Sequence, residues 1–407
     1  MKYVLTIIGL ICLMACSSEE TTRTAETESL MRPIAFGDAY TTQPTRSSAA
    51  YSAEQGLGAE QSIGVYAYLH DNSTWAADEA YNTANPEAPQ RLIPNFMWNQ
   101  KATCLEKGGN FNYSPLKYWP NETSDKVSFI AYFPYTNTTI VEADPANPVD
   151  PASTASTGLT PLLTNSGKGL PSFTFTVKDA VNQQVDFLLS ELLPNLPNGT
   201  SAVSPSNADD RSELTIIDRV HFLFHHMTSK VEFHIVADEK IRKDIVKFQL
   251  NGLNVSHLYK DGKLTPTYSA GTTTYTWTEQ STKHGTSPAY TFPLKTLTSY
   301  LFMPQELSND VMLSIDYDVT FKSDGTTYKY DNEGHLVPQQ DYTYSNSASI
   351  QLNTMKRTGS IEALTEWLPN HHYVYYIRIG AKAIEFTGQV VEWGATVEMN
   401  DIEIKEP

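Results

Sequence analysis

The sequence predicts an all-β protein in which antiparallel sheets pack face to face as β-sandwiches. Three observations support this prediction. Apolar residues recur with a period of two along most of the chain, Asp-Gly pairs separate alternating runs, and long helical periodicity is nearly absent. Because an antiparallel sheet has to bury one face against another layer, sheet-on-sheet packing follows.

The period-two pattern predicts individual strands. The segment 62–69 places Ile63 and Val65 on one face and Tyr66 and Tyr68 on the other, which predicts a half-buried strand. Other segments alternate in the same way or form a short apolar run, and each is expected to be a strand: residues 127–133, 173–177, 185–190 and 313–322.

Turns and helices are predicted at a few positions only. Asp261-Gly262 and Asp324-Gly325 stand between alternating runs, and tight hairpins need residues that tolerate positive φ, so both pairs are predicted hairpin turns. Residues 238–246 are the one segment for which a short helix is expected.

The first fifteen residues form a predicted signal peptide. Lys2 is followed by an apolar run to Ala15 that is too short for a membrane span, which needs about 20 residues. The run Leu13-Met14-Ala15-Cys16 resembles the bacterial lipobox, so Cys16 is predicted to be lipidated and to anchor the chain in the outer membrane. The acidic run after it resembles a signal that sends lipoproteins to the outer face of that membrane. The alternative is an ordinary signal peptide with an incidental cysteine.

A tether and two domains are expected after the leader. Residues 16–30 are mostly Ser, Thr and Glu, which predicts a flexible tether. The chain of 407 residues is long enough for roughly two domains. Residues 194–213 are rich in Pro, Asn, Ser and Gly, so the domains are predicted as 31–212 and 213–407. A new strand pair, 220–224 with 231–235, is expected after the boundary.

Composition and motifs exclude several classes of function. The net charge of −17 argues against nucleic acid as a partner. Only Cys104 remains once the leader and Cys16 are set aside, so no intrachain disulfide is predicted. The chain has no zinc-protease helix, nucleophile elbow or dinucleotide glycine fingerprint. It is therefore predicted not to be an enzyme and to need no cofactor.

Clustered histidines are candidate metal ligands, and clustered aromatic residues are candidate binding sites for sugars or proteins. Adjacent residues of a strand point to opposite faces, so His225 and His226 cannot share a metal; no metal site is predicted, and the nearby His221 and His234 are expected on the surface or in sheet packing. Clustered aromatics can stack on sugars or anchor a protein, although burial in the core is the favoured interpretation. The aromatic residues concerned are Trp98, Tyr113, Tyr118, Trp119, Tyr132 and Tyr135.

Four stretches together resemble a known family. They are SIGVYAYL (62–69), PLKYWPNETSDKVSFIAYFPY (115–135), VDFLLS (185–190) and FLFHHMTSKVEFHI (222–235). In this order they resemble the fimbrillin, or Mfa-like, family of Bacteroidetes type V pilus subunits, over residues from about 34 to 393. The resemblance implies two tandem transthyretin-like Greek-key β-sandwich domains, export as a lipoprotein, and polymerisation by strand exchange after a protease removes the N-terminal strand.

The N-terminal part of the sequence contains a candidate for the strand that a protease would remove. Ile34 and Phe36 lie in an apolar strand candidate, residues 34–40, and the loop that follows carries one basic residue, Arg46. A trypsin-like protease that cuts after Arg46 would release lipid, tether and strand together, and leave an open sheet edge. The alternative is that Arg46 is an ordinary solvated loop residue.

The C-terminal tail is the candidate donor strand. Residues 395–405 are extended and alternating, and the side chains expected to enter a neighbour's groove are Val397, Met399, Ile402 and Ile404. The alternative is that the tail is an edge strand of its own domain. The predicted function is a structural subunit of a cell-surface adhesive pilus, in the stalk in preference to the tip, with other copies or related pilins as partners. The competing hypothesis is a glycan-binding surface lipoprotein.

Overall fold

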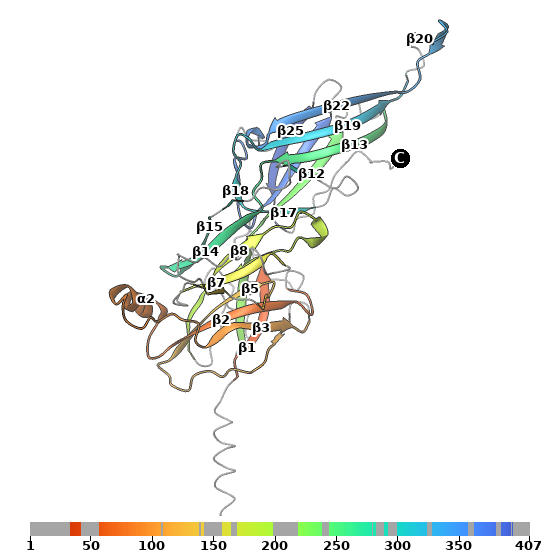
Figure 1. The fold of residues 1–407 in the computed structure, drawn as a ribbon. Coiled ribbons are helices and arrows are strands. Elements are labelled where there is room, and N and C mark those ends of the chain that lie inside the picture. The colour runs from red at the N-terminus through yellow and green to blue at the C-terminus, as the bar shows by residue number, and fades with distance from the viewer. Residues whose placement is uncertain are drawn as a thin grey trace, which may run out of the picture.

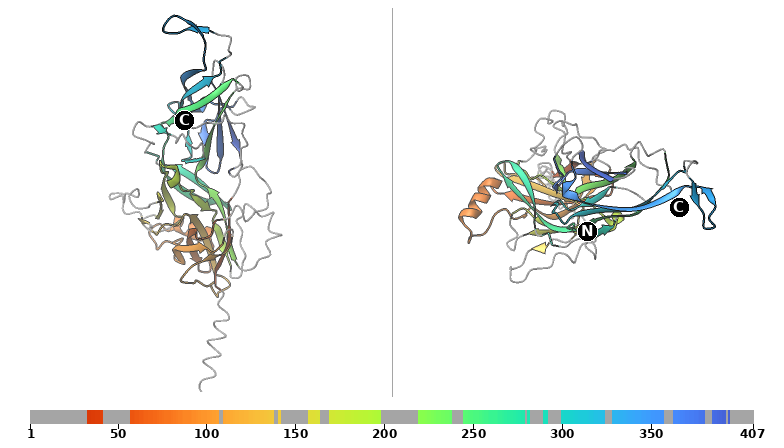
Figure 2. Two further views of the ribbon diagram at one scale, coloured as in Figure 1. Left: turned by 90° about the vertical axis from the view of Figure 1, so that its right-hand side faces the viewer. Right: turned by 90° about the horizontal axis from the view of Figure 1, so that it is seen from above.

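The computed structural model shows an elongated molecule, with β1 to β5 towards one end and β20 at the other (Figures 1 and 2). Among the described residues, no helix is both long enough and apolar enough to cross a membrane. The structure describes residues 33–41, 57–106, 109–137, 140–141, 157–163, 169–197, 219–237, 244–278, 280–281, 289–291, 299–323, 328–356, 362–379, 384–391 and 393.

The N-terminal unit contains an eight-stranded sheet in the order β10-β5-β2-β3-β4-β1-β11-β9. Strand β9 also pairs with β5, so the sheet closes on itself around an apolar core that includes Phe36, Phe129 and Phe222. The strands are β1 Ala35–Thr41, β2 Ser62–His70, β3 Met97–Cys104, β4 Phe111–Asn112, β5 Lys126–Phe133, β9 Leu188–Ser190, β10 Leu193–Leu196 and β11 Arg219–His226.

A second sheet of this unit packs on the outer side of the first. A second core separates the two sheets and joins Tyr66 and Tyr132 to Phe173 and Leu264. Strand β2 is therefore buried on both faces, and the prediction of a half-buried strand was wrong because a further layer covers its tyrosines. The sheet order is β15-β14-β8-β7-β6, with β6 Ile140–Val141, β7 Leu159–Leu163, β8 Ser172–Thr176, β14 Asp261–Ser269 and β15 Thr272–Thr278.

The C-terminal unit is a sandwich of two four-stranded sheets around its own core. One sheet has the order β17-β12-β24-β25, with β12 Ser229–Ala237, β17 Tyr300–Phe302, β24 His372–Ile379 and β25 Ile384–Val391. The other has the order β16-β13-β19-β22, with β13 Ile245–Ser256, β16 Ala289–Thr291, β19 Met312–Phe321 and β22 Tyr342–Gln351. The all-β, sandwich-based fold class is confirmed.

Short elements complete the structure. Two small pairs join β18 Gln305–Glu306 to β23 Glu366–Trp367, and β20 Tyr328–Tyr330 to β21 Leu336–Pro338. Single 3-10 turns span η3 Val181–Gln183 and η5 Leu352–Thr354.

The described α-helix, α2 Trp75–Ala84, was missed by the sequence analysis. Its start is defined by Thr74, whose hydroxyl accepts a hydrogen bond from the Ala77 N–H at 3.3 Å. The helix expected over 238–246 was wrong at its C-terminal end, because Ile245 opens the long strand β13, where it pairs with Phe321. Residues 238–243 lie outside the described residues.

One of the two predicted Asp-Gly turns was wrong. Asp261 and Gly262 lie inside β14, where they pair with β8, and the β14–β15 turn falls at Ala270 and Gly271. Both turn residues have positive φ, 51° and 87°, as a tight hairpin requires. The other Asp-Gly pair lies outside the described residues.

The strands on either side of residue 228 do not pair with one another. Strand β11 pairs with β1 and β9 in the N-terminal unit, whereas β12 pairs with β17 and β24 in the C-terminal unit. The expected strand pair 220–224 with 231–235 was therefore wrong, since both strands find distant partners. The proposed domain boundary near residue 212 lies outside the described residues.

Candidate assembly site: the first strand and its groove

The first strand, β1, is an interior strand of the closed sheet. It runs parallel to β11 from Ala35, opposite Arg219, to Thr41, opposite Phe224, with a register shift between Phe36 and Ala39. On its other side Phe36 pairs with Phe111 of β4. The strand predicted over 34–40 is thus present with bounds shifted by one residue.

Phe36 fills an aromatic pocket. Its side chain is fully buried, and its ring centroid lies 5.1 Å from that of Tyr113, 5.5 Å from Phe222 and 6.1 Å from Phe129. These partners come from different parts of the sheet and the loop after β4. Removal of β1 would therefore leave a deep apolar pocket as well as an open strand edge.

Ile34 holds the beginning of the strand. Its N–H donates to the carbonyl of Lys117 at 2.8 Å, and its carbonyl accepts from the Tyr113 hydroxyl at 2.7 Å. Burial raises the pKa of Tyr113, so this hydroxyl stays protonated and remains a donor. Ile34 is itself buried in the same core as Phe36.

Gly37 allows a close approach between β1 and β11. A Cβ atom at this position would lie 2.5 Å from Cε1 of His221, closer than any real contact allows. His221, one of the histidines weighed as a metal ligand, is therefore buried against the backbone of the first strand. A strand that replaced β1 with a larger residue at this point would have to displace the His221 ring.

The chain segment that joins β1 to β2 contains the predicted cleavage residue. Strand β1 ends at Thr41 and β2 begins at Ser62, so a cut after Arg46 would separate β1 from the rest of the sheet. Arg46 itself lies outside the described residues, as do Cys16 and the donor candidates Val397, Met399, Ile402 and Ile404.

The other three histidines that were considered as metal ligands each contact a different carboxylate. His225 Nε2 lies 2.9 Å from Glu191, His226 Nδ1 lies 2.7 Å from Asp186, and His234 Nε2 lies 3.1 Å from Glu232. Nothing in this arrangement brings the histidines to a common point.

Glu232 is the centre of a buried polar cluster that the sequence analysis missed. His234 lies 3.1 Å and the fully buried His372 3.2 Å from its carboxylate, which also accepts a hydrogen bond from the hydroxyl of Ser299, and Lys230 lies 3.5 Å away. Burial alone would raise the pKa of Glu232, but these contacts outweigh it and hold this pKa well below its usual range. The partners come from β12, β24 and the residue before β17, so the cluster ties three neighbouring strands together.

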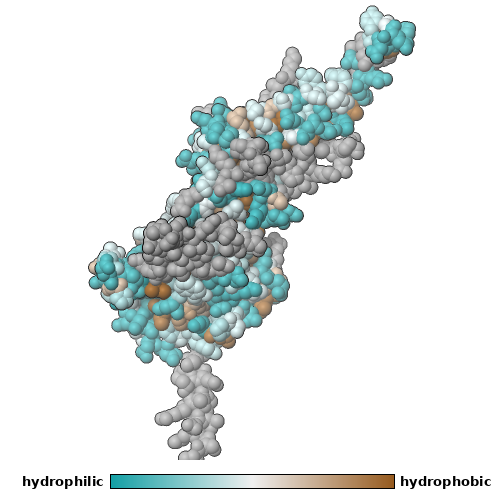
Figure 3. Space-filling view, viewed as in Figure 1, coloured by the Kyte–Doolittle hydropathy of each residue, from teal (hydrophilic) through white to brown (hydrophobic). Residues whose placement is uncertain are grey.

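The aromatic residues divide between core and surface. Trp119 is 3% exposed and Tyr132 is fully buried, as expected, and Tyr113 lines the Phe36 pocket. Trp98 and Tyr118 are instead 45% and 43% exposed. Figure 3 shows a surface on which hydrophilic residues predominate and apolar residues are scattered in small groups.

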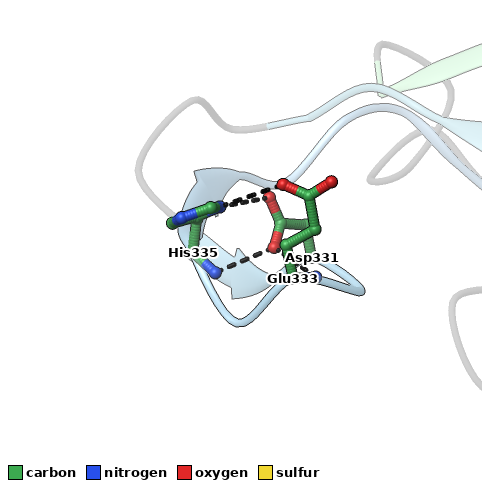
Figure 4. A group of neighbouring side chains, drawn as sticks. All are labelled: Asp331, Glu333 and His335. Atoms are coloured by element: carbon green, nitrogen blue, oxygen red, sulfur yellow. Dashed lines mark hydrogen bonds and ion pairs between the residues drawn. The ribbon is translucent and has the colours of Figure 1, made fainter.

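Asp331, Glu333 and His335 meet at the tip of the β20–β21 hairpin (Figure 4), with side-chain ligand atoms within 4.8 Å of one another. Asp331 accepts hydrogen bonds from the backbone N–H groups of His335 at 2.8 Å and Glu333 at 2.9 Å. These bonds lower the pKa of Asp331 and close the turn. Glu333 and His335 are exposed and Asp331 is half-buried, and the Asp331 carboxylate is used in the turn.

The family of the chain follows from a comparison of its sequence with known families. Residues 45–393 match a family model described as fimbrillin-like. This chain belongs to that family. No curated protein matches the sequence of this fimbrillin-like protein.

Solved structures of similar fold come from Bacteroidetes. A fimbrial protein from Bacteroides vulgatus is 18% identical, with a TM-score of 0.50, and the match covers 90% of this chain and 100% of that one. A putative cell adhesion protein from Bacteroides uniformis is 15% identical, with a TM-score of 0.43 and coverage of 89% and 98%. A fimbrilin from Porphyromonas gingivalis is 8% identical, with a TM-score of 0.37 and coverage of 90% and 99%. The similarity to the Bacteroides vulgatus protein supports the β-sandwich fold.

Membership in the fimbrillin-like family supports the role of a pilus subunit and a place at the cell surface. The family is one of structural proteins, not of enzymes. In this fimbrillin-like protein, β1 is an interior strand of the closed sheet, and its apolar side chains are buried in the sheet's core.

Proposed function

We propose that this protein is a stalk subunit of an adhesive pilus, exported as a lipoprotein through Cys16 and held at the outer membrane until assembly. A protease cuts after Arg46 and releases lipid, tether and β1. The C-terminal strand of a second subunit, either another copy or a related pilin, then enters the vacated groove. Successive subunits join head to tail, which is a contact that does not close and so builds a filament.

The position of β1 carries this proposal. It is paired on both sides, so its loss exposes hydrogen-bonding groups of β11 and β4 together with the pocket of Phe36. An incoming strand can pair with the exposed backbone groups and fill the Phe36 pocket. The backbone hydrogen bonds then provide affinity, and the pocket provides specificity. Until the cut, β1 remains tethered and competes as an intramolecular ligand at high effective concentration.

The spacing of apolar residues in the C-terminal tail supports the tail as the donor strand. The buried apolar residues Ile34, just before β1, and Phe36 and Ala39 within it are separated by two and then three positions, and the register shift falls between Phe36 and Ala39. Val397, Met399 and Ile402 have the same two-then-three spacing. In this alignment Ile404 falls on Thr41, and Asn400 falls on Gly37. The side chain of Asn400 would meet the His221 ring, which would have to move.

The cleavage step is tested with Arg46→Ala. We expect trypsin-treated wild-type protein to form filaments visible by electron microscopy, whereas Arg46→Ala forms none. The matched control is Arg91→Ala, which removes an arginine that binds Asp78 far along the chain from the β1–β2 segment. Filaments from Arg46→Ala would show that another site is cut or that cleavage is unnecessary.

The donor register is tested by deletion of Asn400. The deletion brings Met399 and Ile402 two positions apart, so that only one of them can match the Phe36–Ala39 spacing, and elongation should fail while cleavage proceeds. The control is Asp401→Asn, which keeps the spacing and removes one charge. Filaments from the deletion variant, at the wild-type yield, would show that the donor strand comes from elsewhere in the chain.

The glycan-binding alternative has the exposed Trp98 and Tyr118 in its favour. A glycan array probed with wild type and with Trp98→Ala distinguishes the two functions. Binding that depends on Trp98 in a protein that forms no filaments after proteolysis would favour the alternative.

A further inference from the structure

Among the described residues, strand β22 is a long edge strand of the C-terminal unit with no strand on its outer side. It pairs with β19 over ten residues without a register shift, and within the described part of the chain it is the last strand of its sheet. Its sequence, YTYSNSASIQ, contains no charged residue and no proline. Edge strands usually carry such residues or bulges, because an open edge pairs readily with other strands. Edge strand β10 contains Pro194, and edge strand β25 contains Glu385.

The free hydrogen-bonding groups of β22 belong to its odd-numbered residues. The N–H of Leu352 donates to Val311, so even positions bond towards β19 and odd positions point away from it. The N–H of Ser347 agrees with this, because it donates to the side chain of its neighbour Asn346 at 2.9 Å and not to β19.

Apolar area also lies open along this edge. Tyr344 and Tyr342 are 58% and 47% exposed, although they share the sheet face on which Ala348 and Ile350 pack against the core. Tyr342 stacks on Phe321, at 5.6 Å between ring centroids. Both tyrosines therefore present apolar rings beside a strand edge that lacks a partner strand in the described structure.

We propose that β22 is an interface with the β22 strand of a second copy, paired antiparallel about a two-fold axis at Asn346. In this register Tyr342 faces Ile350 of the other copy and Tyr344 faces its Ala348, so each exposed ring gains an apolar neighbour. On the opposite face, serine and threonine hydroxyls meet. The outward-pointing odd residues pair with one another and form about eight backbone hydrogen bonds. The contact joins two molecules side by side and is independent of strand exchange.

Charge explains why the second copy is a suitable occupant. The chain carries a net charge of −17, which opposes self-association, but the strand itself is neutral. The nearest acidic residues on this sheet, Asp316 and Asp318, lie on β19. Across the interface they would be separated from their counterparts by three strand spacings, roughly 14 Å. That distance exceeds the Debye length of about 8 Å at physiological salt, so the repulsion is largely screened there, and the contact should weaken only when the salt concentration is lowered.

Sedimentation equilibrium of the uncleaved protein tests the proposal. Ser347→Pro removes an outward N–H without a loss of bonds to β19, and Asn346→Lys places like charges opposite one another at the two-fold axis. Each should weaken the dimer about tenfold or more, a difference of about 1.4 kcal/mol. The matched control is Asn251→Lys, on the same sheet but on β13, two strands from the edge; it should dimerise as the wild type does.

Two results would overturn this inference. One is a wild-type protein that remains monomeric at every concentration and at high salt. The other is a dimer that Ser347→Pro and Asn346→Lys leave unchanged, which would place the contact elsewhere. Because the protein is not cleaved in this experiment, the outcome does not depend on whether filaments form by strand exchange.

Discussion

Replacement of Phe36 by alanine measures how strongly the first strand is held. The side chain is fully buried and touches three rings, so little of the lost contact can be recovered by relaxation. Truncation of a buried phenylalanine costs about 3 to 5 kcal/mol, and each aromatic pair adds about 0.5 to 1.5 kcal/mol beyond the buried area. We therefore expect a loss near the upper end, about 5 kcal/mol.

Urea denaturation of the uncleaved protein gives this free energy of unfolding directly. The control is Phe321→Ala, because Phe321 is only partly buried and stacks on one exposed tyrosine; a loss of about 1 kcal/mol is expected there. After a cut at Arg46, the Phe36→Ala strand should be released faster than the wild-type strand. A stability within about 0.5 kcal/mol of wild type would refute the idea that Phe36 anchors β1 in its groove.

Three further predictions concern other parts of the chain. Trp119→Ala should cost about 3 to 5 kcal/mol in thermal or urea unfolding, because its ring is buried with its edge near Phe129; a loss of glycan binding at unchanged stability would contradict this. Cys16→Ala should abolish labelling of the protein by a radioactive fatty acid, and a labelled variant would show that the lipid is attached elsewhere. Since the pKa of Glu232 is lower in the folded protein than its ordinary value of 4.5, its carboxylate stabilises the fold above that pH, and this contribution disappears as the pH falls through the folded pKa. Glu232→Gln should therefore lower stability at neutral pH and make it less dependent on pH below the ordinary carboxyl pKa of 4.5; an unchanged acid-unfolding curve would count against the cluster.

Local patterns in the sequence predicted strands well and their partners poorly. The alternation at 62–69 and 313–322 identified β2 and β19, because a period of two is a property of a few neighbouring residues. The pairing of β1 with β11 joins residues that are far apart in the chain, and no local pattern specifies it. For the same reason, no local pattern shows that β11 and β12 enter different sheets.

The candidate site was only partly accessible from sequence. Ile34 and Phe36 were identified as strand residues, but their pocket depends on Tyr113, Phe129 and Phe222, which come together only in the closed sheet. Helix α2 had a local signal that was overlooked, since Thr74 precedes an alanine-rich stretch and Asn85-Pro86 follows it. The Glu232 cluster has no such signal, because His372 reaches it from a distant strand.

The five-stranded sheet takes β7 and β8 from the first half of the chain and β14 and β15 from the second. Leu264 and Met303 lie in the same core as Phe173 and Phe187, so the first half of the chain cannot complete this core without the second half. We expect the two units to unfold in one cooperative step, and a fragment that stops near residue 212 to fold poorly. We expect such a subunit under a constant pulling force to unfold as a whole and not one domain at a time. A filament built from it should therefore keep its length under shear flow.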